Sequence, residues 1–218
     1  MRKGPRTTQN ETARVRALYD QMAPRYDAMI TVVERMLIAD GRQWACGQAV
    51  GRVLEVAIGT GRNLGCYPPE VDLVGIDVSP KMLDVARTRA SGLARRVELQ
   101  VADAQSLPFE EATFDMVVAT LTLCSIPQDR RALAEVARVL RPGGRLVLLD
   151  HVASPVRAVR AVQRVLDPLM VRFMGDHLLR EPQAGVQQAG LVIDELTRSK
   201  WGIVARLRAH KPTATRDA

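Results

Sequence analysis

A short stretch in the first third of the chain has residue types suited to binding a ligand through the backbone. Residues 53–64 read VLEVAIGTGRNL, so an apolar, β-branched run carries Glu55 near its centre and then breaks into Gly59 and Gly61. Glycines at this spacing permit unusual dihedrals and let a ligand lie against the backbone without an intervening Cβ. Whatever binds there must therefore approach the main chain closely.

A dinucleotide would use similar chemistry, but the sequence lacks its fingerprint. Counting on from Gly59 and Gly61, Leu64 stands where the third glycine of G-x-G-x-x-G belongs. Asp77 ends the next apolar run, where a carboxylate can accept hydrogen bonds from both ribose hydroxyls of an adenosine. A nicotinamide oxidoreductase is thus a disfavoured alternative, and a nucleoside ligand is favoured.

Seven apolar runs position these residues and alternate with helical patterns. The alternation predicts an α/β fold, which is a Rossmann-like seven-stranded, mostly parallel sheet with the last strand antiparallel and helices on both faces. Too few residues separate the last two runs for a crossover helix. The expected strands are 52–57, 72–77, 97–101, 114–119, 144–150, 191–197 and 203–209.

Two helices have recognisable ends. SPKMLDVARTRA begins with Ser79 as a cap and Pro80 at the first helical position. SIPQDRRALAEVARVLRPGG starts at Ser125, and we expect its helix to end at Pro142, before the two glycines.

The composition of the chain indicates which class of protein it belongs to. The chain of 218 residues is 47% hydrophobic and 25% charged, as in soluble proteins. No apolar run reaches the ~18 residues of a membrane span, and no apolar segment follows the basic N-terminus as in a secretion signal. We therefore expect a cytoplasmic protein.

Cysteines and histidines do not form a metal-binding pattern. With no C-x-x-C and no H-x-x-x-H spacing, we expect reduced thiols and no metal. The residues concerned are Cys46, Cys66, Cys124, His151, His177 and His210.

The net charge of +7 could attract nucleic acid or an anionic membrane. The arginines are scattered, however, and only three Phe, three Tyr and two Trp could stack on bases. We expect no nucleic-acid partner.

Four segments, taken together, resemble the class I S-adenosylmethionine-dependent methyltransferases. They are LEVAIGTG, VGIDVSPKML, VADAQSLPF with FDMVVAT, and RALAEVARVLRPGGRLVLLDH, in order and at normal separations. The resemblance covers roughly residues 15–210. The ubiquinone/menaquinone C-methyltransferases look most similar and also open with a segment like APRYD. Bacterial phosphatidylethanolamine N-methyltransferases and methyltransferase-like thiol S-methyltransferases look similar too.

The resemblance implies S-adenosyl-L-methionine as cofactor, S-adenosyl-L-homocysteine as product and a set of binding residues. Glu55 and the loop 57–61 would hold the methionine portion, Asp77 the ribose, and Asp103 with Ala104 the adenine edge. A glutamate suits an α-ammonium group better than a phosphate. The full expected set is Glu55, Ala57, Gly59, Thr60, Gly61, Asp77, Val78, Asp103, Ala104, Thr120 and Tyr26.

Three of these residues need comment. Thr120, just past the fourth strand, would line the cofactor near its methyl group. Tyr26, in APRYD, matches a lid tyrosine of relatives, although it could equally be a packing aromatic. Ala57 departs from the pattern, because many relatives carry a glycine there; we expect its methyl group to be tolerated.

The resemblance also implies one domain with four parts. Residues 12–48 would form an N-terminal helical lid and residues 49–150 the cofactor-binding core. Residues 152–181 would form a helical insertion over the acceptor pocket, and residues 191–210 the C-terminal strand pair.

Transfer from a sulfonium needs proximity and exclusion of water more than a dedicated base. His151, with Asp150 before it, is the candidate catalytic pair, as a base or an orienting pair. The alternative is a structural histidine. His177 could touch the acceptor or cap a helix, His210 is expected to be solvated, and Cys124 is expected to be a small core residue.

The insertion contains an amphipathic pattern with two interpretations. It could lie on an anionic membrane, which would suit a lipid acceptor. We favour the commoner arrangement, a helix packed over the core with its arginines in water; Pro168 should kink it. The apolar face holds Val159, Val162, Leu166, Leu169 and Phe173, opposite Arg157, Arg160, Arg164 and Arg172.

The sequence thus predicts a methyltransferase for a small, rather apolar acceptor with a sulfur, nitrogen, oxygen or carbon nucleophile. Two alternatives stay open. One is a phospholipid (phosphatidylethanolamine-type) N-methyltransferase at the membrane surface, and the other is a non-catalytic cofactor-binding or scaffolding relative. The sequence leaves the acceptor and the oligomeric state open.

Overall fold

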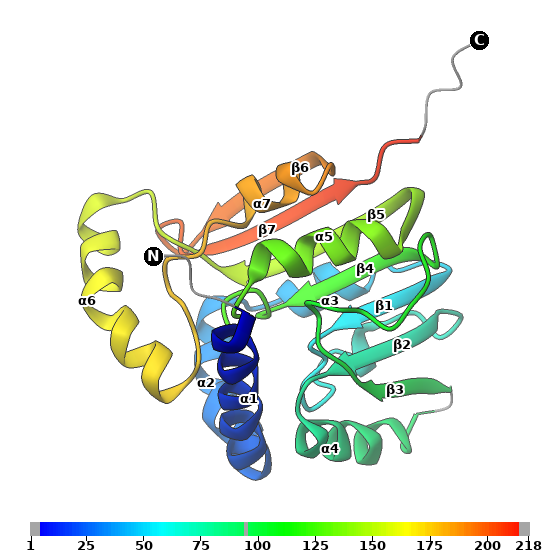
Figure 1. Ribbon diagram of the computed structural model, residues 1–218, viewed down its shortest axis with the longest axis horizontal. Helices are drawn as coiled ribbons and strands as arrows, with labels where there is room; N and C mark the ends of the chain where they lie inside the picture. The colour runs from blue at the N-terminus through cyan, green and yellow to red at the C-terminus, as the bar shows by residue number, and fades with distance from the viewer. Residues whose placement is uncertain (1–4, 94–95, 214–218) are drawn as a thin grey trace.

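A seven-stranded sheet of order β3-β2-β1-β4-β5-β7-β6 forms the centre of the computed structural model, which describes residues 5–93 and 96–213 (Figure 1). The first five strands are parallel, whereas β7 runs antiparallel to both of its neighbours. This confirms the predicted sheet. The strands are β1 (Arg52–Val56), β2 (Asp72–Asp77), β3 (Val97–Val101), β4 (Phe114–Thr120), β5 (Leu140–His151), β6 (Val192–Ser199) and β7 (Val204–His210).

Helices cover both faces of the sheet, as predicted. Leu133 and Val136 of α5 pack with one strand face, while Leu83 of α4 and Ala45 of α3 pack with the other. The helices are α1 (Pro5–Met22), α2 (Tyr26–Leu37), α3 (Gly41–Cys46), α4 (Pro80–Ala90), α5 (Asp129–Val139), α6 (Arg157–Phe173) and α7 (Pro182–Gln188), with the 3-10 turns η1 (Ala23–Arg25) and η2 (Leu64–Cys66).

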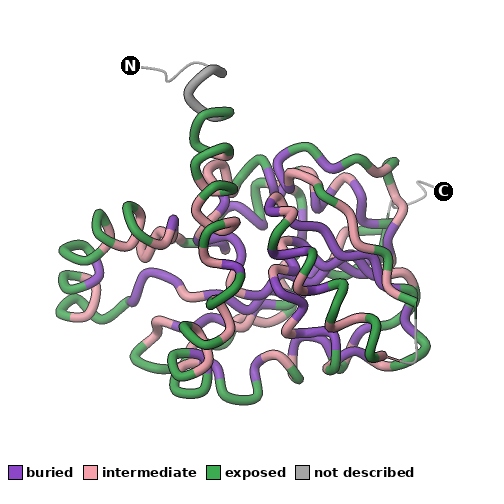
Figure 2. The backbone as a smooth tube through the Cα atoms, turned by 90° about the horizontal axis from the view of Figure 1, so that it is seen from below, coloured by how far each residue is buried: buried purple, intermediate pink, exposed green. Residues whose placement is uncertain are grey.

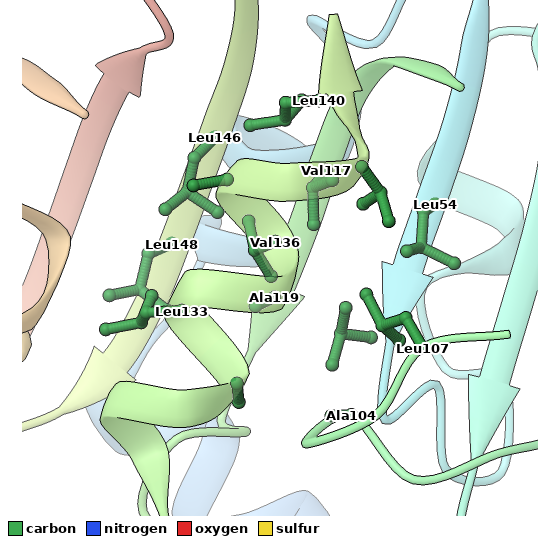
Figure 3. Close-up of a cluster of buried hydrophobic side chains, with 14 of the residues drawn as sticks. Leu54, Ala104, Leu107, Val117, Ala119, Leu133, Val136, Leu140, Leu146 and Leu148 are labelled. Carbon is green, nitrogen blue, oxygen red and sulfur yellow. The ribbon is translucent and has the colours of Figure 1, made fainter. Parts of the chain in front are cut away.

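The core beneath α5 fixes the strands that carry the site. Leu133 and Val136 pack over Val117 of β4 and Leu148 of β5 (Figure 3), and all four side chains are fully or almost fully buried. Burial of each such side chain contributes roughly 1.5–3 kcal/mol. The loops at the ends of β4 and β5 therefore start from rigid positions.

Of the two predicted helix ends, one is confirmed and the other is wrong. Ser79 caps α4 as predicted, because its Oγ accepts a hydrogen bond from the Met82 amide (3.1 Å). The prediction that the next helix runs to Pro142 is wrong. The α5 helix ends at Val139, and β5 begins at Leu140, which pairs with Phe114. Strand pairing therefore takes over before the proline is reached.

The helices α1, α2 and α6 lie beyond the carboxyl ends of the parallel strands (Figure 1). In an open α/β sheet this end is where ligands bind. Among the described helices, none combines the length and apolar character needed to cross a bilayer.

The α6 helix does not pack as predicted. It continues through Pro168, and its apolar residues Val165 (78% exposed) and Phe173 (59% exposed) face solvent. The buried residue is instead Gln163. Figure 2 shows the helix at the margin of the molecule with most of its length exposed. The expectation of an apolar face packed over the core is wrong.

Hydrogen bonds hold α6 in this orientation. The Gln163 Nε2 donates to the carbonyls of Val152 (2.9 Å) and Leu178 (3.2 Å), and its Oε1 accepts from the Ser154 amide (2.8 Å). Asp167 accepts from the Leu178 amide (2.7 Å). The side of the helix that faces the protein is therefore a polar one.

In this orientation, truncating a polar residue of α6 should destabilise the protein more than truncating an apolar one. Gln163→Ala should lower the free energy of unfolding by about 1–3 kcal/mol, because buried backbone groups lose their partners. Val165→Ala, at an apolar but exposed position, should change it by less than about 0.5 kcal/mol. Urea denaturation measures both. A larger loss for Val165→Ala than for Gln163→Ala would contradict the orientation.

Candidate functional site

The loop after β1 has the backbone conformation that its glycines predicted. Gly59 (φ +59°) and Gly61 (φ +76°) both lie in the left-handed region. A Cβ added at Gly59 would meet no atom within 4 Å, whereas one at Gly61 would lie 2.7 Å from Leu64 Cδ1. Gly59 therefore leaves open space above the loop, and Gly61 permits close packing beneath it.

A cavity of about 830 Å³, with its open mouth included, lies above this loop. Its size is that of an ordinary small-molecule site. The predicted residues that line it are Ala57, Gly59, Thr60, Asp77, Val78, Asp103, Ala104, Thr120 and Tyr26.

Two predicted residues lie behind the lining. Gly61 acts through packing, as described above. Glu55 is 2% exposed, and its Oε1 accepts a hydrogen bond from Asn63 Nδ2 (2.7 Å). The same Nδ2 donates to Thr120 Oγ1 (2.8 Å), which does line the cavity. Glu55 thus orients the wall through Asn63, and its direct contact with a ligand stays a prediction.

Asp77 ties the loop to the end of β2. One carboxylate oxygen accepts from the Gly59 amide (2.9 Å) and the other from the Ser79 amide (2.8 Å). Burial raises the pKa of Asp77 to about 6, although these two amides oppose the rise. The result is a desolvated hydrogen-bond acceptor in the cavity wall.

The α1 helix closes the cavity above Asp103. Gln105 Nε2 donates to both carboxylate oxygens of Asp103 (2.9 and 3.1 Å) and to Thr12 Oγ1 of α1 (3.0 Å). Val15 and Tyr19 of the same helix also line the cavity. Residues of the region 12–48 therefore line one side of the cavity, and their role as a lid stays a prediction.

Charged side chains fasten α2 to the glycine loop. Glu34 is buried and forms ion pairs with both Arg42 and Arg62. Burial alone would lower the pKa of the Arg42 guanidinium, but the hydrogen bond and charge of Glu34 raise it. Arg42 also donates to Thr120 Oγ1 (3.3 Å), so a firmly ionised cation stands in the cavity wall.

A second set of contacts holds the start of α2. Asp27 accepts from Thr60 Oγ1 (2.6 Å) and pairs with Arg89 of α4 (2.5 Å). Burial opposes ionisation of Asp27, but these hydrogen bonds lower its pKa below the usual range. Its carboxylate therefore stays charged and keeps Tyr26, the adjacent residue, against the site.

The residue after β4 is strained. Leu121 lies in the left-handed region (φ +53°), and its amide donates to the Leu149 carbonyl of β5 (2.7 Å). A branched residue there costs roughly 1–2 kcal/mol. Since Leu121 lines the cavity, the strain lies where it shapes the site.

The predicted catalytic pair lies beside the cavity rather than in its lining. Asp150 accepts from the backbone amides of Thr122 (3.2 Å), Leu123 (2.8 Å) and His151 (2.8 Å). Its role in the structure is to hold the loop after β4. The His151 Nδ1 is buried with no hydrogen-bond partner in the part of the chain that the structure describes.

The fold brings two further groups to His151. Cys124, His151 and Asp176 each offer a ligand-type atom, and these atoms lie within 4.8 Å of one another. Asp176 accepts from Tyr19 Oη (3.1 Å), and Tyr19 lines the cavity. A chain of polar contacts therefore connects the cluster to the cavity.

This cluster has donor atoms that zinc accepts. Asp176 is already engaged by Tyr19, and burial together with the charge of Asp150 raises the pKa of the Cys124 thiol. A raised pKa opposes the thiolate that a metal requires. The expectation of no metal stays a prediction, and elemental analysis of the purified protein tests it.

Sequence reasoning missed Arg42, Tyr19 and Asp176. Nothing in the local sequence separates Arg42 from the many other arginines. Tyr19 lies seven residues before Tyr26, and their ring centroids are 6.1 Å apart, but a turn interrupts the helix between them. Asp176 is 25 residues from His151 along the chain, so only the fold reveals the contact.

The remaining histidines have other roles. The His177 amide donates to the Cys124 carbonyl (2.8 Å), and burial together with Arg180 lowers the pKa of its ring. His210 was expected to be solvated; it is 38% exposed, with Nδ1 lying 2.7 Å from an oxygen of Asp194.

Comparison with known proteins agrees with this geometry. Residues 54–148 match the family described as Methyltransferase domain. The demethylmenaquinone methyltransferase of Clavibacter sepedonicus is 30% identical over 94% of this chain and 93% of its own length. The phosphatidylethanolamine N-methyltransferase of Cereibacter sphaeroides is 42% identical over 53% of this chain, and that match spans 58% of the relative's length.

A solved structure shows how widely the fold is used. The [4+2]-cyclase SpnF superimposes with a TM-score of 0.66 over 80% of each chain at 22% identity. At this identity the likeness concerns the fold alone. Architecture by itself therefore does not decide the reaction.

The loop geometry predicts opposite effects for two substitutions. Ala57 has φ +51°, so Ala57→Gly should raise the free energy of unfolding by about 0.5–1 kcal/mol by relieving left-handed strain. Gly61→Ala should lower it by roughly 1–3 kcal/mol through the same strain and the contact with Leu64. Equilibrium denaturation in urea compares them. A destabilising Ala57→Gly or a neutral Gly61→Ala would show that this loop conformation is wrong.

Proposed function

The chain belongs to the class I S-adenosylmethionine-dependent methyltransferases, and we propose that it transfers the methyl group of S-adenosylmethionine to a small, rather apolar acceptor. The observation that carries the proposal is the arrangement of Gly59, Asp77 and Asp103 in the wall of one cavity at the carboxyl ends of β1, β2 and β3. The cofactor, when bound, supplies an activated methyl group on a sulfonium.

The residues of the cavity fit such a ligand. The open space above Gly59 accommodates a group pressed against the backbone. Asp77 offers two carboxylate oxygens to ribose hydroxyls, and Asp103 with the Ala104 amide suits the edge of an adenine. Thr120 and Arg42 line the same cavity and are hydrogen-bonded to each other, and in this proposal the amino-acid portion lies beside them.

On the acceptor side, the residues position the nucleophile and exclude water. Tyr19, Tyr26, Leu121 and Ile126 give the cavity an aromatic and aliphatic wall. This aromatic and aliphatic lining supports an apolar acceptor. Bringing the nucleophile in line with the methyl group would supply most of the rate.

His151 is the proposed proton-accepting or orienting group. Its support is the buried, unpartnered Nδ1 within the described structure and its place beside Asp176. In this proposal the imidazole accepts a hydrogen bond from the acceptor or removes its proton, and Asp176 orients the ring. Asp150 acts one step away, by holding the loop 122–123.

A phosphatidylethanolamine-type lipid is the second candidate acceptor. Two observations favour it: the 42% identical relative that bears this activity in its name, and the exposed apolar face of α6. The alternatives of a non-catalytic relative and of a nicotinamide enzyme have no comparable support. A cytoplasmic location is also proposed, on the basis of three free cysteines.

The pKa of Asp77 predicts how cofactor affinity depends on pH. Ribose hydroxyls donate best to an ionised carboxylate, and the free site has a pKa of about 6. Calorimetric titration with S-adenosylhomocysteine should give a constant Kd above about pH 7. As the pH falls through 6, Kd should rise and approach a tenfold increase per pH unit, because binding must then release a proton.

Asp77→Asn is the matched variant. It should bind at least tenfold more weakly at pH 7.5, since one acceptor oxygen is lost, and its affinity should not change between pH 5 and 7. A flat profile for the wild-type protein, or an unchanged Kd for the variant, would mean that the ribose site is misplaced.

His151 is tested by turnover. After thiols, amines, phenols and phosphatidylethanolamine vesicles have been screened for methyl transfer, His151→Ala should lower kcat roughly 10²-fold with the accepted substrate. Its affinity for S-adenosylhomocysteine should stay within twofold. His210→Ala, at the far strand pair, is the control and should leave kcat unchanged. Near-normal turnover of His151→Ala at every pH would make the histidine structural.

A further inference from the structure

We propose that α6, together with the turn that carries Trp201, forms a docking surface for an anionic lipid bilayer. The surface, called the α6 stripe below, consists of Val162, Val165, Leu166, Leu169 and Phe173. The proposal concerns binding only and does not require that the acceptor be a lipid.

The α6 stripe is continuous, and the described part of the chain leaves it exposed. Its residues recur at i, i+3, i+4, i+7 and i+11, so they share one face of the helix. All five are between 45% and 78% exposed. Soluble proteins rarely leave a contiguous apolar patch of this kind without a partner.

The orientation of the stripe is built into the fold. Gln163 and Asp167, on the opposite side, bind backbone groups of Val152 and Leu178. Arg160 donates to the Ser154 carbonyl (2.8 Å) and pairs with Glu181. Rotating the helix to bury the stripe would break all of these contacts, so the apolar face stays directed outward.

The charged residues of α6 favour an anionic bilayer over a neutral one. Arg157, Arg164 and Arg172 are exposed on the polar side of α6, where Arg172 flanks the stripe and the other two lie farther round the helix. The one acidic residue of α6, Asp167, is engaged by the Leu178 amide and faces the protein. A helix with an exposed apolar band and only basic residues among its exposed charges matches the boundary between anionic headgroups and acyl chains.

An exposed tryptophan lies near the start of α6. The Trp201 carbonyl accepts from Ser154 Oγ (2.5 Å), three residues before the helix begins, and its side chain is 77% exposed. Tryptophan is enriched where membranes meet water. This residue therefore extends the docking surface at one end and provides a spectroscopic reporter.

The α2 helix has the same character at the same end of the molecule. Met29, Val32, Val33 and Met36 recur at i, i+3, i+4 and i+7 and are 46% to 67% exposed. Its two acidic residues, Asp27 and Glu34, are engaged with cations of the loop and of α3 and α4. Both α2 and α6 lie at the carboxyl ends of the strands (Figure 1), so a bilayer bound there would be close to the cavity.

Vesicle co-sedimentation of the full chain, without cofactor, tests the proposal. At 150 mM salt the protein should pellet with phosphatidylglycerol/phosphatidylcholine vesicles and stay in the supernatant with phosphatidylcholine alone. Leu169→Ser combined with Phe173→Ser should lower the partition coefficient at least tenfold. Arg157→Gln combined with Arg164→Gln should lower it about 10- to 30-fold for anionic vesicles. Because these positions are exposed, all variants should keep the wild-type Tm.

Matched controls separate docking from general stickiness. Val50→Ser removes another exposed apolar side chain (59% exposed), and Arg145→Gln removes an exposed arginine of β5; neither lies on α6. Both should bind like wild type. In a Trp44→Phe background, Trp201 emission should shift to the blue on adding anionic vesicles.

Several outcomes would overturn the proposal: no pelleting with anionic vesicles, equal binding to neutral ones, or equal losses in the controls. A dimer in light scattering that the Leu169/Phe173 double variant converts to a monomer, without vesicle binding, would assign the stripe to self-association. None of these outcomes bears on the S-adenosylhomocysteine titration, so the proposed function stands or fails separately.

Discussion

The hydrogen bond from the Gly59 amide to the Asp77 carboxylate is the interaction on which the site depends. It joins the loop after β1 to the end of β2, and the Ser79 amide holds the other carboxylate oxygen. A buried carboxylate is costly unless such donors surround it. The same donors therefore stabilise the charge and fix the curvature of the loop, and they leave the cavity side of the carboxylate for a ligand.

The N-terminal helices are held over this loop chiefly by ion pairs and hydrogen bonds. Glu34 lies between Arg42 and Arg62, and Asp27 binds Thr60 and Arg89. Buried ion pairs contribute little net stability, but breaking one of them is costly. They therefore act mainly to specify one position for α2 while its apolar side faces outward. An apolar seam would instead have buried Met29 and Val33, which are exposed.

The α6 helix is likewise attached to the protein through polar contacts. There Gln163 and Asp167 form the internal contacts and the apolar residues face away. Two helices at the carboxyl ends of the strands thus present apolar side chains to the outside (Figure 1). The fold recurs in a cyclase, whereas the exposed apolar faces belong to α2 and α6, outside the sheet. Differences in acceptor and location are therefore expected to reside in these helices.

Most of the fold and part of the site could be predicted from the sequence, because they depend on local sequence patterns. The alternation of apolar runs determined the strands to within a few residues, and the glycine spacing determined the left-handed turns at Gly59 and Gly61. Asp77 is the last residue of β2 and Asp103 comes two residues after β3, so their place at the carboxyl edge of the sheet was predictable. Tertiary structure alone decided the rest. Asp176 meets His151 across 25 residues, and Arg42 reaches the cavity through its pairing with Glu34. The hydrophobic pattern of α6 gave the correct helix and the correct face, but a pattern cannot say whether that face meets the core or the solvent. Hydrogen bonds from Gln163 to backbone groups outside the helix decided that.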